Sequence, residues 1–447
     1  MVSKAKAWIR NCQSSHPNCP RAKIQRLPSR VVDVGTESKS PSVRVHTVAA
    51  QQCGEYICLS YCWGGPQAIT ATQNTLQELQ NGIPVENLGQ TIQDAIEVTR
   101  QLGFRYLWVD ALCIIQDDDK DKEREIHNMA SIYKNATITI AASTSTNSYE
   151  GFLRRKRTPP LGPKCHLPIE LPDGKVGKVS LVSSRHHYPN HPLDSRAWAY
   201  QEFLLSTRVL VYSDVELLWE CESQRQVPVR ESFVSYEDNS PRRRLQELRR
   251  RVRRNEDRMY WNWHLIVNYY ARRAMTDPED RLNAIAGVAE VVGQLLNDEY
   301  MFGIWKSSAV DFLGWSTWSP TRRSPRAPSW SWASVDSPVG FSDYKPLAKV
   351  LACPPRPGDA RGLVLMGKVR SKLPRGLSGS FRLDAEVEEC ERKRRRYLLL
   401  GDLGHNTGAT ALILMQVGQN RYRRIGCIDR IAIDLWHDCA EREITLE

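Results

Sequence analysis

A short apolar run between Tyr106 and Gln116, YLWVDALCIIQ, constrains the fold of this chain more than any other segment. It is rich in large side chains, contains a single acid, and is followed at once by DDDKDKEREI. Residues 106–109 are typical of a strand that is buried on both faces, as a central parallel strand is when helices cover the sheet. Asp110 then falls where this strand ends. Because the carboxyl ends of such strands border the ligand crevice, Asp110 is a candidate functional residue.

Two further strands and two helices are expected around this segment. The strands are predicted at 55–61 and 136–142, where the sequence reads EYICLSY and ATITIAA, and the helices at 91–102 and 120–134. Strand, helix, strand, helix, strand at this spacing predicts an α/β fold with a mostly parallel sheet, right-handed crossovers and flanking helices.

The segments that follow these three strands are 62–65, 110–116 and 143–147. Because the carboxyl ends of parallel strands lie at one edge of the sheet, we expect the three segments to converge on one cleft. The residues that we expect to bind a ligand there are Ser60, Tyr61, Trp63, Gly64, Cys113, Gln116 and Asp117.

The rest of the chain divides by its pattern into further segments. An N-terminal extension (1–50) precedes the α/β core (51–150). After the core we expect a bridging helix and hairpin that complete this region (151–240), a helical region (241–340) and a small antiparallel β subdomain (341–447).

Several acids and one thiol lie near the central strand, and each of them can be interpreted either as a chemical group of a site or as a structural residue. Asp110 suits a general base or a ribose or cation ligand, and equally a helix cap. Cys113 with His127 suggests a nucleophile and its base, although a buried thiol is the usual outcome. Glu125 either faces the crevice or favours the helix dipole. The acidic run 117–121 lacks the glycine and the spacing of an EF-hand, which favours a solvated helix start.

Cysteines are numerous in this chain, which has twelve. Cys12, His16 and Cys19 form a CxxxHxxC pattern that resembles half of a zinc site. A structural site needs four ligands, and no fourth is evident nearby in the sequence. We therefore expect these three residues to pack in a core, and we expect no metal and no structural disulfide.

The cellular compartment and the net charge that the sequence predicts restrict the partners that this chain can have. The first residues, MVSKAKAWIRNC, lack the apolar region of a secretion signal, which predicts a cytoplasmic protein and leaves the nucleus open. No uncharged apolar run reaches the length of a membrane span, so no membrane partner is expected. The net charge of +11 is concentrated at 242–258 and 392–396. Such runs can contact nucleic acid, but a solvated helix face and a charged turn are favoured.

Three stretches of the core resemble the heterokaryon incompatibility (HET) domain of fungi. They are YICLSYCWG, TIQDAIEVTRQLGFRYLWVDALCIIQDDD and EIHNMASIYKNATITIAAS. RAWAYQEFLLSTRVL, WEC, DPEDRLNAIAGVAE and APSWSWASV are similar to companion blocks of the HET-6-like proteins. The resemblance covers roughly residues 8–435.

The resemblance implies a function in fungal nonself recognition, a form of innate immunity in which HET domains trigger programmed cell death after incompatible hyphae fuse. Protein partners are implied, among them the product of an incompatible allele, and also self-association. HET domains are distantly similar to Toll/interleukin-1 receptor domains, some of which cleave NAD with one glutamate. By that analogy Glu125 is the catalytic residue, and Asp110 is the other candidate. NAD would then be a substrate, and no cofactor is implied with certainty. A non-enzymatic interaction module is the alternative, and a nuclear nucleic-acid-associated factor is a third.

Overall fold

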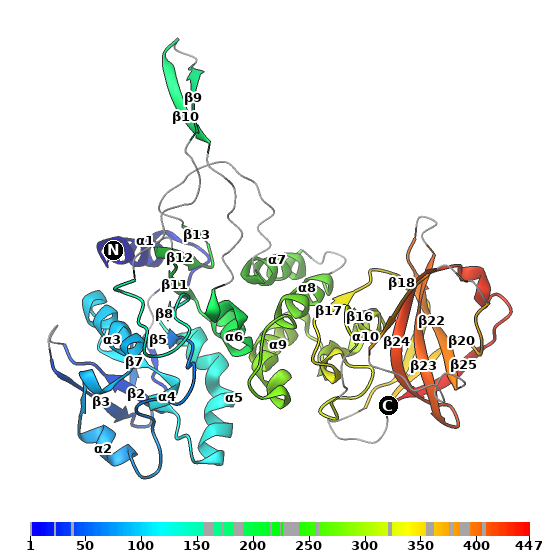
Figure 1. Cartoon of the computed structure of the whole chain (residues 1–447), viewed down its shortest axis with the longest axis horizontal. Helices are drawn as coiled ribbons and strands as arrows, with labels where there is room; N and C mark the ends of the chain where they lie inside the picture. The colour runs from blue at the N-terminus through cyan, green and yellow to red at the C-terminus, as the bar shows by residue number, and fades with distance from the viewer. Residues whose placement is uncertain are drawn as a thin grey trace. The chain divides into compact units, whose positions relative to one another are not determined.

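The chain forms two compact units, Met1–Ser235 and Tyr236–Glu447 (Figure 1). The computed structural model describes residues 2–21, 24–36, 40–155, 165–171, 174–181, 191–214, 217–223, 225–226, 241–254, 259–320, 324–354, 362–374, 377, 379–384, 394–404 and 408–447.

The first unit contains a sheet that has nine strands among the described residues. In spatial order they are β13 (Arg225–Gln226), β12 (Leu217–Cys221), β11 (Arg208–Tyr212), β8 (Ile138–Ala141), β5 (Tyr56–Ser60), β7 (Tyr106–Trp108), β2 (Arg30–Asp33), β3 (Ser42–Thr47) and β6 (Ile83–Pro84). Two smaller pairs accompany it, β1 (Gln25–Arg26) with β4 (Cys53–Gly54), and β9 (Cys165–Glu170) with β10 (Val176–Leu181).

The expectation of a mostly parallel sheet needs correction, because the sheet is mixed. Among the described strands of this sheet, only the four central ones, β11, β8, β5 and β7, pair in parallel. On one side β2, β3 and β6 add antiparallel strands, and on the other side β12 and β13 do the same. The added strands come from the N-terminal extension, from residues 83–84 and from a hairpin after the core. Short connections favour the antiparallel pairing of β2 with β3 and of β11 with β12, whereas β2–β7 and β3–β6 pair across long intervals. The likeness to Toll/interleukin-1 receptor domains is left untested by this topology.

The helices of the first unit occupy the predicted segments and some others. They are α1 (Val2–Ser15), α2 (Leu76–Asn81), α3 (Gln90–Leu102), α4 (Asp110–Cys113), α5 (Asp119–Asn135) and α6 (Ala197–Leu205), with short 3₁₀ turns η1 (Val85–Asn87) and η2 (Pro192–Ser195). Helix α3 ends at Gly103, which adopts a left-handed conformation with φ 92°. Helix α5 begins after Asp118, whose side chain accepts hydrogen bonds from the backbone of Lys120 and Asp121.

The order of the central strands places a topological switch point in the sheet. From β5 the chain crosses to β7 on one side, and from β7 it returns past β5 to β8 on the other side. Right-handed crossovers in these opposite directions put α3 and α5 on opposite faces of the sheet. Strand β5 is buried along its whole length, as a strand covered on both faces must be. A ligand crevice is therefore expected beyond the carboxyl ends of β5 and its neighbours.

The second unit begins with helices and ends with a β sheet. Its helices are α7 (Pro241–Arg253), α8 (Trp261–Tyr270), α9 (Asn283–Leu296) and α10 (Ala309–Leu313), with 3₁₀ turns η3 (Pro278–Arg281), η4 (Lys306–Ser308), η5 (Trp332–Ser334) and η6 (Ile433–Trp436). Two short strand pairs lie among them, β14 (Tyr300–Met301) with β15 (Ile304–Trp305) and β16 (Trp315–Thr317) with β17 (Val339–Phe341).

The sheet of the second unit is antiparallel apart from the pair β24–β25. Its strands are β18 (Lys345–Pro346), β22 (Arg395–Asp402), β23 (Ala409–Gly418), β24 (Arg421–Ile431), β25 (Glu441–Leu446), β20 (Leu363–Arg370) and β19 (Lys349–Ala352), with β21 (Ser380–Leu383) on β24. Strand β22 also pairs with β20, so the sheet closes on itself. The buried ion pair of Arg424 with Asp384 lies beside the ring of Trp315.

The first basic run, 242–258, falls largely on helix α7. Arg250 and Arg251 there form ion pairs with Glu247, at 2.6 Å and 3.1 Å. Residues 255–258 of this run, and 392–393 of the second, lie outside the described residues. Among the described residues, no helix combines the length and the apolar character needed to cross a bilayer.

Candidate functional site

The ends of strands β5 and β7 are joined by side chains that the sequence singled out. The indole N–H of Trp63 donates a hydrogen bond of 2.9 Å to the carboxylate of Asp110. The backbone N–H of Ala111 donates to the other carboxylate oxygen over 2.7 Å. Gln116 lies on the same loop and donates its amide to the backbone carbonyl of Asp110 over 3.3 Å. Trp63, Asp110 and Gln116 are therefore close together, as predicted from the strand order.

The third predicted loop reaches the same edge of the sheet through Gly64. This residue has φ +69°, and a Cβ built on it would lie 2.1 Å from the Cβ of Asn147 and 2.8 Å from the carbonyl oxygen of Thr146. The backbone N–H of Ser148 donates to the carbonyl of Trp63 over 3.2 Å. Only glycine permits so close an approach in this conformation, so Gly64 brings the ends of β5 and β8 into contact.

A second carboxylate interacts electrostatically with Asp110, and it comes from helix α6. Glu202 is buried and accepts a hydrogen bond from the hydroxyl of Ser60 at the end of β5. Arg196, at the start of the same helix, donates to the backbone carbonyl of Tyr61. The carboxyl ends of the central strands therefore hold a group of buried and half-buried polar side chains, which we call the strand-end cluster: Ser60, Tyr61, Trp63, Asp110, Arg196 and Glu202.

The cluster changes the acidity of both its carboxyl groups. Burial raises the pKa of Asp110 above its usual range, while Arg196, the Trp63 indole and the Ala111 N–H act in the opposite direction. Burial raises the pKa of Glu202 to about 7, against the effect of Arg196 and the Ser60 hydrogen bond, and the charge of Asp110 adds to the rise. A carboxyl group with a pKa near neutrality can both donate and accept a proton.

Exposure differs from residue to residue across the cluster. Ser60 and Tyr61 are buried, whereas Trp63 and Asp110 are half-buried and Gly64 is exposed. Burial, and next the charge of Asp110, raises the pKa of the Tyr61 hydroxyl well above its ordinary value. Asp110 is thus the more exposed of the two acidic residues in the cluster.

Two other predicted site residues, Asp117 and Cys113, are not part of the strand-end cluster. Asp117 is exposed, and its carboxylate accepts a hydrogen bond of 2.8 Å from the backbone N–H of Gln73. Cys113 is fully buried, and burial raises the pKa of its thiol to about 12. His127 is exposed on helix α5. A buried thiol with so high a pKa is a poor nucleophile, so Cys113 fits the structural interpretation better than the catalytic one.

Glu125 is held in a separate group of charges on the inner side of helix α5. Its carboxylate accepts a hydrogen bond of 2.6 Å from Ser29 and lies 3.8 Å from the guanidinium of Arg30 and 3.3 Å from that of Arg124. Arg30 also forms a buried ion pair with Asp121. The structure therefore brings Asp110 to the strand-end cluster and places the contacts of Glu125 in an ion-pair network with strand β2.

The sequence reasoning places Glu202 on the expected bridging helix and does not predict it as a site residue. Glu202 is separated from Ser60 by 142 residues, and only the packing of α6 on β5 brings them together.

A signal for the buried position of Glu125 was present in the sequence. Asp121 and Glu125 precede Met129 at intervals of four residues, which places all three on the buried stripe of the helix.

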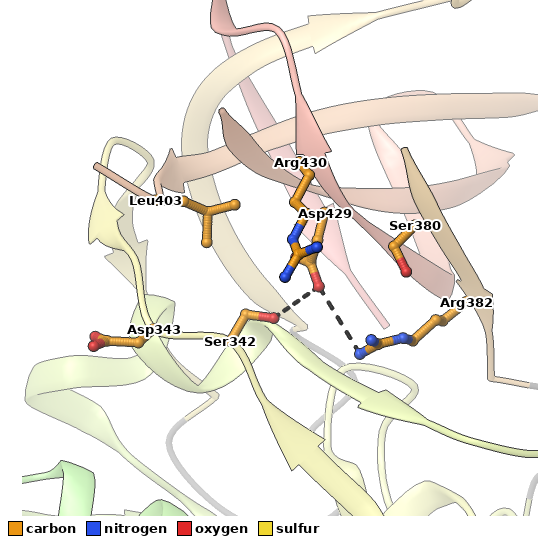
Figure 2. Close-up of a pocket in the computed structure, with 7 residues that line it drawn as sticks. All are labelled: Ser342, Asp343, Ser380, Arg382, Leu403, Asp429 and Arg430. Carbon is orange, nitrogen blue, oxygen red and sulfur yellow. Dashed lines mark hydrogen bonds and ion pairs between the residues drawn. The ribbon is translucent and has the colours of Figure 1, made fainter. Parts of the chain in front are cut away.

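A separate pocket lies in the second unit (Figure 2). It has a volume of about 310 Å³ and is lined by Ser342, Asp343, Ser380, Arg382, Leu403, Asp429 and Arg430. The carboxylate of Asp429 accepts a hydrogen bond of 2.9 Å from Ser342 and lies 4.0 Å from Arg382. Two acids and two arginines line the pocket, so their charges balance and favour neither an anion nor a cation.

Comparison with known proteins shows which family the region around the strand-end cluster resembles. The model of the family described as Heterokaryon incompatibility protein (HET) matches residues 56–202, which begin with strand β5 and end at Glu202. The curated protein Heterokaryon incompatibility protein 6, OR allele, of Neurospora crassa is 30% identical over 101 residues. This alignment covers 21% of the chain and 15% of that relative. No solved structure matches the chain.

Proposed function

We propose that this chain, whose residues 56–202 match the model of the HET family, acts in heterokaryon incompatibility as an intracellular protein that triggers cell death when it detects a nonself partner. The strand-end cluster is the observation that supports a particular site for this function. All six of its residues lie within the matched range, at the switch point of the sheet where α/β proteins bind ligands.

Within this proposal, Asp110 is the group that meets the ligand and Glu202 is the proton donor and acceptor behind it. Asp110 is half-buried and fixed in direction by Trp63 and Ala111. Glu202 has a pKa of about 7. Titratable groups with such perturbed acidity gather at functional sites.

NAD is the first substrate to test. Cleavage of its bond to nicotinamide passes through a cationic, oxocarbenium-like state, which a fixed carboxylate stabilises. The half-buried Asp110 meets this requirement better than Glu125, because the carboxylate of Glu125 is already bonded to Ser29 and paired with Arg30 and Arg124.

The test uses the full chain in a fungal host, with cell death and cellular NAD measured together. Asp110→Asn and Glu202→Gln keep the side-chain shapes and remove the charges, so both should lower NAD loss and killing per folded molecule at least about 100-fold. Glu125→Gln is the matched variant from the ion-pair network. It should act mainly through stability and leave activity per folded molecule close to that of the parent chain.

A non-enzymatic interaction module is the second candidate, and one observation favours it. Hairpin β9–β10 exposes apolar side chains at alternate positions, Leu167, Ile169 and Leu171, together with Val176. Exposed apolar faces of this kind serve protein contacts. If the parent chain kills while NAD stays intact, and if charged substitutions at Ile169 and Val176 abolish killing, self-association or a protein partner is the function. A role on nucleic acid would instead require binding that weakens steeply with salt.

A further inference from the structure

Four side chains from distant parts of the first unit meet in one small group. They are Cys12, His16, Cys19 and Cys221, and their potential ligand atoms all lie within 4.8 Å of one another. The three sulfur-bearing residues are buried and His16 is half-buried. Cys221 is the fourth residue that the pattern CxxxHxxC lacked in the sequence.

The fold brings these residues together through helix α1 and strand β12. Cys12 lies on α1, His16 and Cys19 lie in the turn that follows it, and Cys221 is the last residue of β12. The helix contacts the strand, where the rings of Trp8 and Trp219 pack with their centroids 6.3 Å apart. The group therefore connects the N-terminal helix to the hairpin that follows the region 56–202.

The distances from the His16 ring nitrogen to two of the sulfurs match those of a tetrahedral zinc site. Nδ1 of His16 lies 3.7 Å from Sγ of Cys19 and 3.4 Å from Sγ of Cys221. With Zn–S near 2.3 Å and Zn–N near 2.0–2.1 Å, two ligand atoms at a tetrahedral angle are about 3.6 Å apart. Nδ1 is thus the nitrogen directed at the sulfurs, and the proton of the imidazole then belongs on Nε2.

The charge around the group also suits a metal with three thiolates. Zinc with three thiolates and one neutral imidazole has a net charge of −1. The guanidinium of Arg208 supplies the compensating charge, because its Nε lies 3.2 Å from Sγ of Cys12. The hydroxyl of Ser223 lies 3.4 Å from Sγ of Cys19, where it can donate to a bound thiolate. Such outer contacts orient ligands and stabilise their ionised form.

We propose that Cys12, His16, Cys19 and Cys221 bind one zinc ion as a structural site that fixes helix α1 to the edge hairpin of the sheet. All four coordination positions come from the protein, which is the arrangement of a structural site and leaves no open position for a substrate. Because the ligands lie outside residues 56–202, the metal stabilises the two segments that flank the HET domain.

The first experiment measures metal content and thiol reactivity of the full chain. Chain purified with reductant and dialysed against chelator-free buffer should contain about one zinc ion per molecule by elemental analysis. Removal of the zinc with a strong chelator should expose three further thiols to a chromogenic reagent and lower the melting temperature. Parent chain that holds no stoichiometric zinc, or that contains a disulfide within the group, would overturn the proposal.

Variants separate coordination from folding. Cys221→Ser should lose most of the zinc, whereas Cys53→Ser, which removes an exposed thiol elsewhere, should retain it. His16→Cys keeps four ligands and should still bind zinc. Cobalt added to the zinc-free parent should give the absorption bands of a tetrahedral thiolate complex, and these should be absent from Cys221→Ser. Equal zinc content in Cys221→Ser and the parent chain would contradict the assignment of the fourth ligand.

Discussion

The indole of Trp63 and the carboxylate of Asp110 share a hydrogen bond of 2.9 Å that links the ends of two neighbouring parallel strands. Trp63 follows β5 and Asp110 follows β7. The bond holds a half-buried carboxylate in one orientation, and the Ala111 N–H fixes its second oxygen. Such an arrangement presents a charge in a fixed direction at the edge where the sheet can bind a ligand.

Replacement of Trp63 by phenylalanine tests this link. The variant keeps an aromatic ring and removes the N–H donor, which leaves one oxygen of Asp110 without its partner. We expect a loss of about 1–3 kcal/mol in the free energy of unfolding. The loss should be larger near pH 8 than near pH 4, because burial raises the pKa of Asp110 and only the ionised group needs the donor fully. Urea unfolding at the two pH values measures it, and an equal loss at both would contradict the assigned role.

Glu202 should make the stability of the chain depend on pH. Burial raises its pKa from the usual 4.5 to about 7, so between these values the folded chain holds more protons than the unfolded chain. The free energy of unfolding must then fall as the pH rises through this window, by at most about 3 kcal/mol, and the stabilising contribution is complete only below the window. In Glu202→Gln the fall should disappear from urea unfolding curves recorded across the window.

The matched control for Glu202 is Glu97→Gln, which removes an exposed carboxyl group from helix α3. It should retain the pH dependence of the parent chain. A parent chain whose stability rises between about pH 5 and pH 7 more steeply than that of Glu202→Gln would show that the sign is wrong.

The central part of the fold could be predicted from the sequence because local patterns determine it. Strands β5, β7 and β8 and helices α3 and α5 all lie within two residues of the predicted bounds. Their apolar runs and helical stripes depend only on residues near one another in the chain. The convergence of the three strand ends followed from their order alone.

The remaining features depend on pairs of residues far apart in the sequence, and no local pattern reports such pairs. Glu202 meets Ser60 across 142 residues, and Cys221 meets His16 across 205. The antiparallel pairing of β2 with the central strand β7 was missed for the same reason, because the two strands lie far apart in the sequence. A search for a zinc ligand near Cys19 in the sequence therefore could not find one.

Of the ion-paired arginines described in the first unit, Arg30 should contribute most to the free energy of unfolding. It is buried, it pairs with Asp121 and Glu125, and it donates to the carbonyl of Cys113 over 2.7 Å. Arg30→Met removes the buried cation and leaves the buried carboxylates of Asp121 and Glu125 with Arg124, whose side chain is 54% exposed. We expect a loss of about 3–5 kcal/mol in the free energy of unfolding, measured in urea.

Arg44→Met is the matched control, since Arg44 pairs with Asp33 over 3.3 Å while its side chain is 55% exposed. Arg105 also donates twice to Asp33, so the carboxylate keeps a partner. The control should cost less than about 1 kcal/mol. Similar losses for the two variants would mean that the Arg30 network contributes no more than a surface ion pair.

Gly64 should tolerate substitution far less well than a glycine of the same conformation in open space. Gly64 and Gly35 have φ +69° and +74°, so alanine meets the same left-handed backbone at both. Around Gly35 no atom lies within 4 Å of the added Cβ, whereas at Gly64 the Cβ would overlap Asn147. Gly35→Ala should therefore cost about 1–2 kcal/mol from the backbone alone. Gly64→Ala should cost about 2–5 kcal/mol in all, because the loop after β8 must also move. Thermal and urea unfolding of the two variants give the comparison. Equal destabilisation would mean that the ends of β5 and β8 do not approach each other as closely as the strand-end cluster requires.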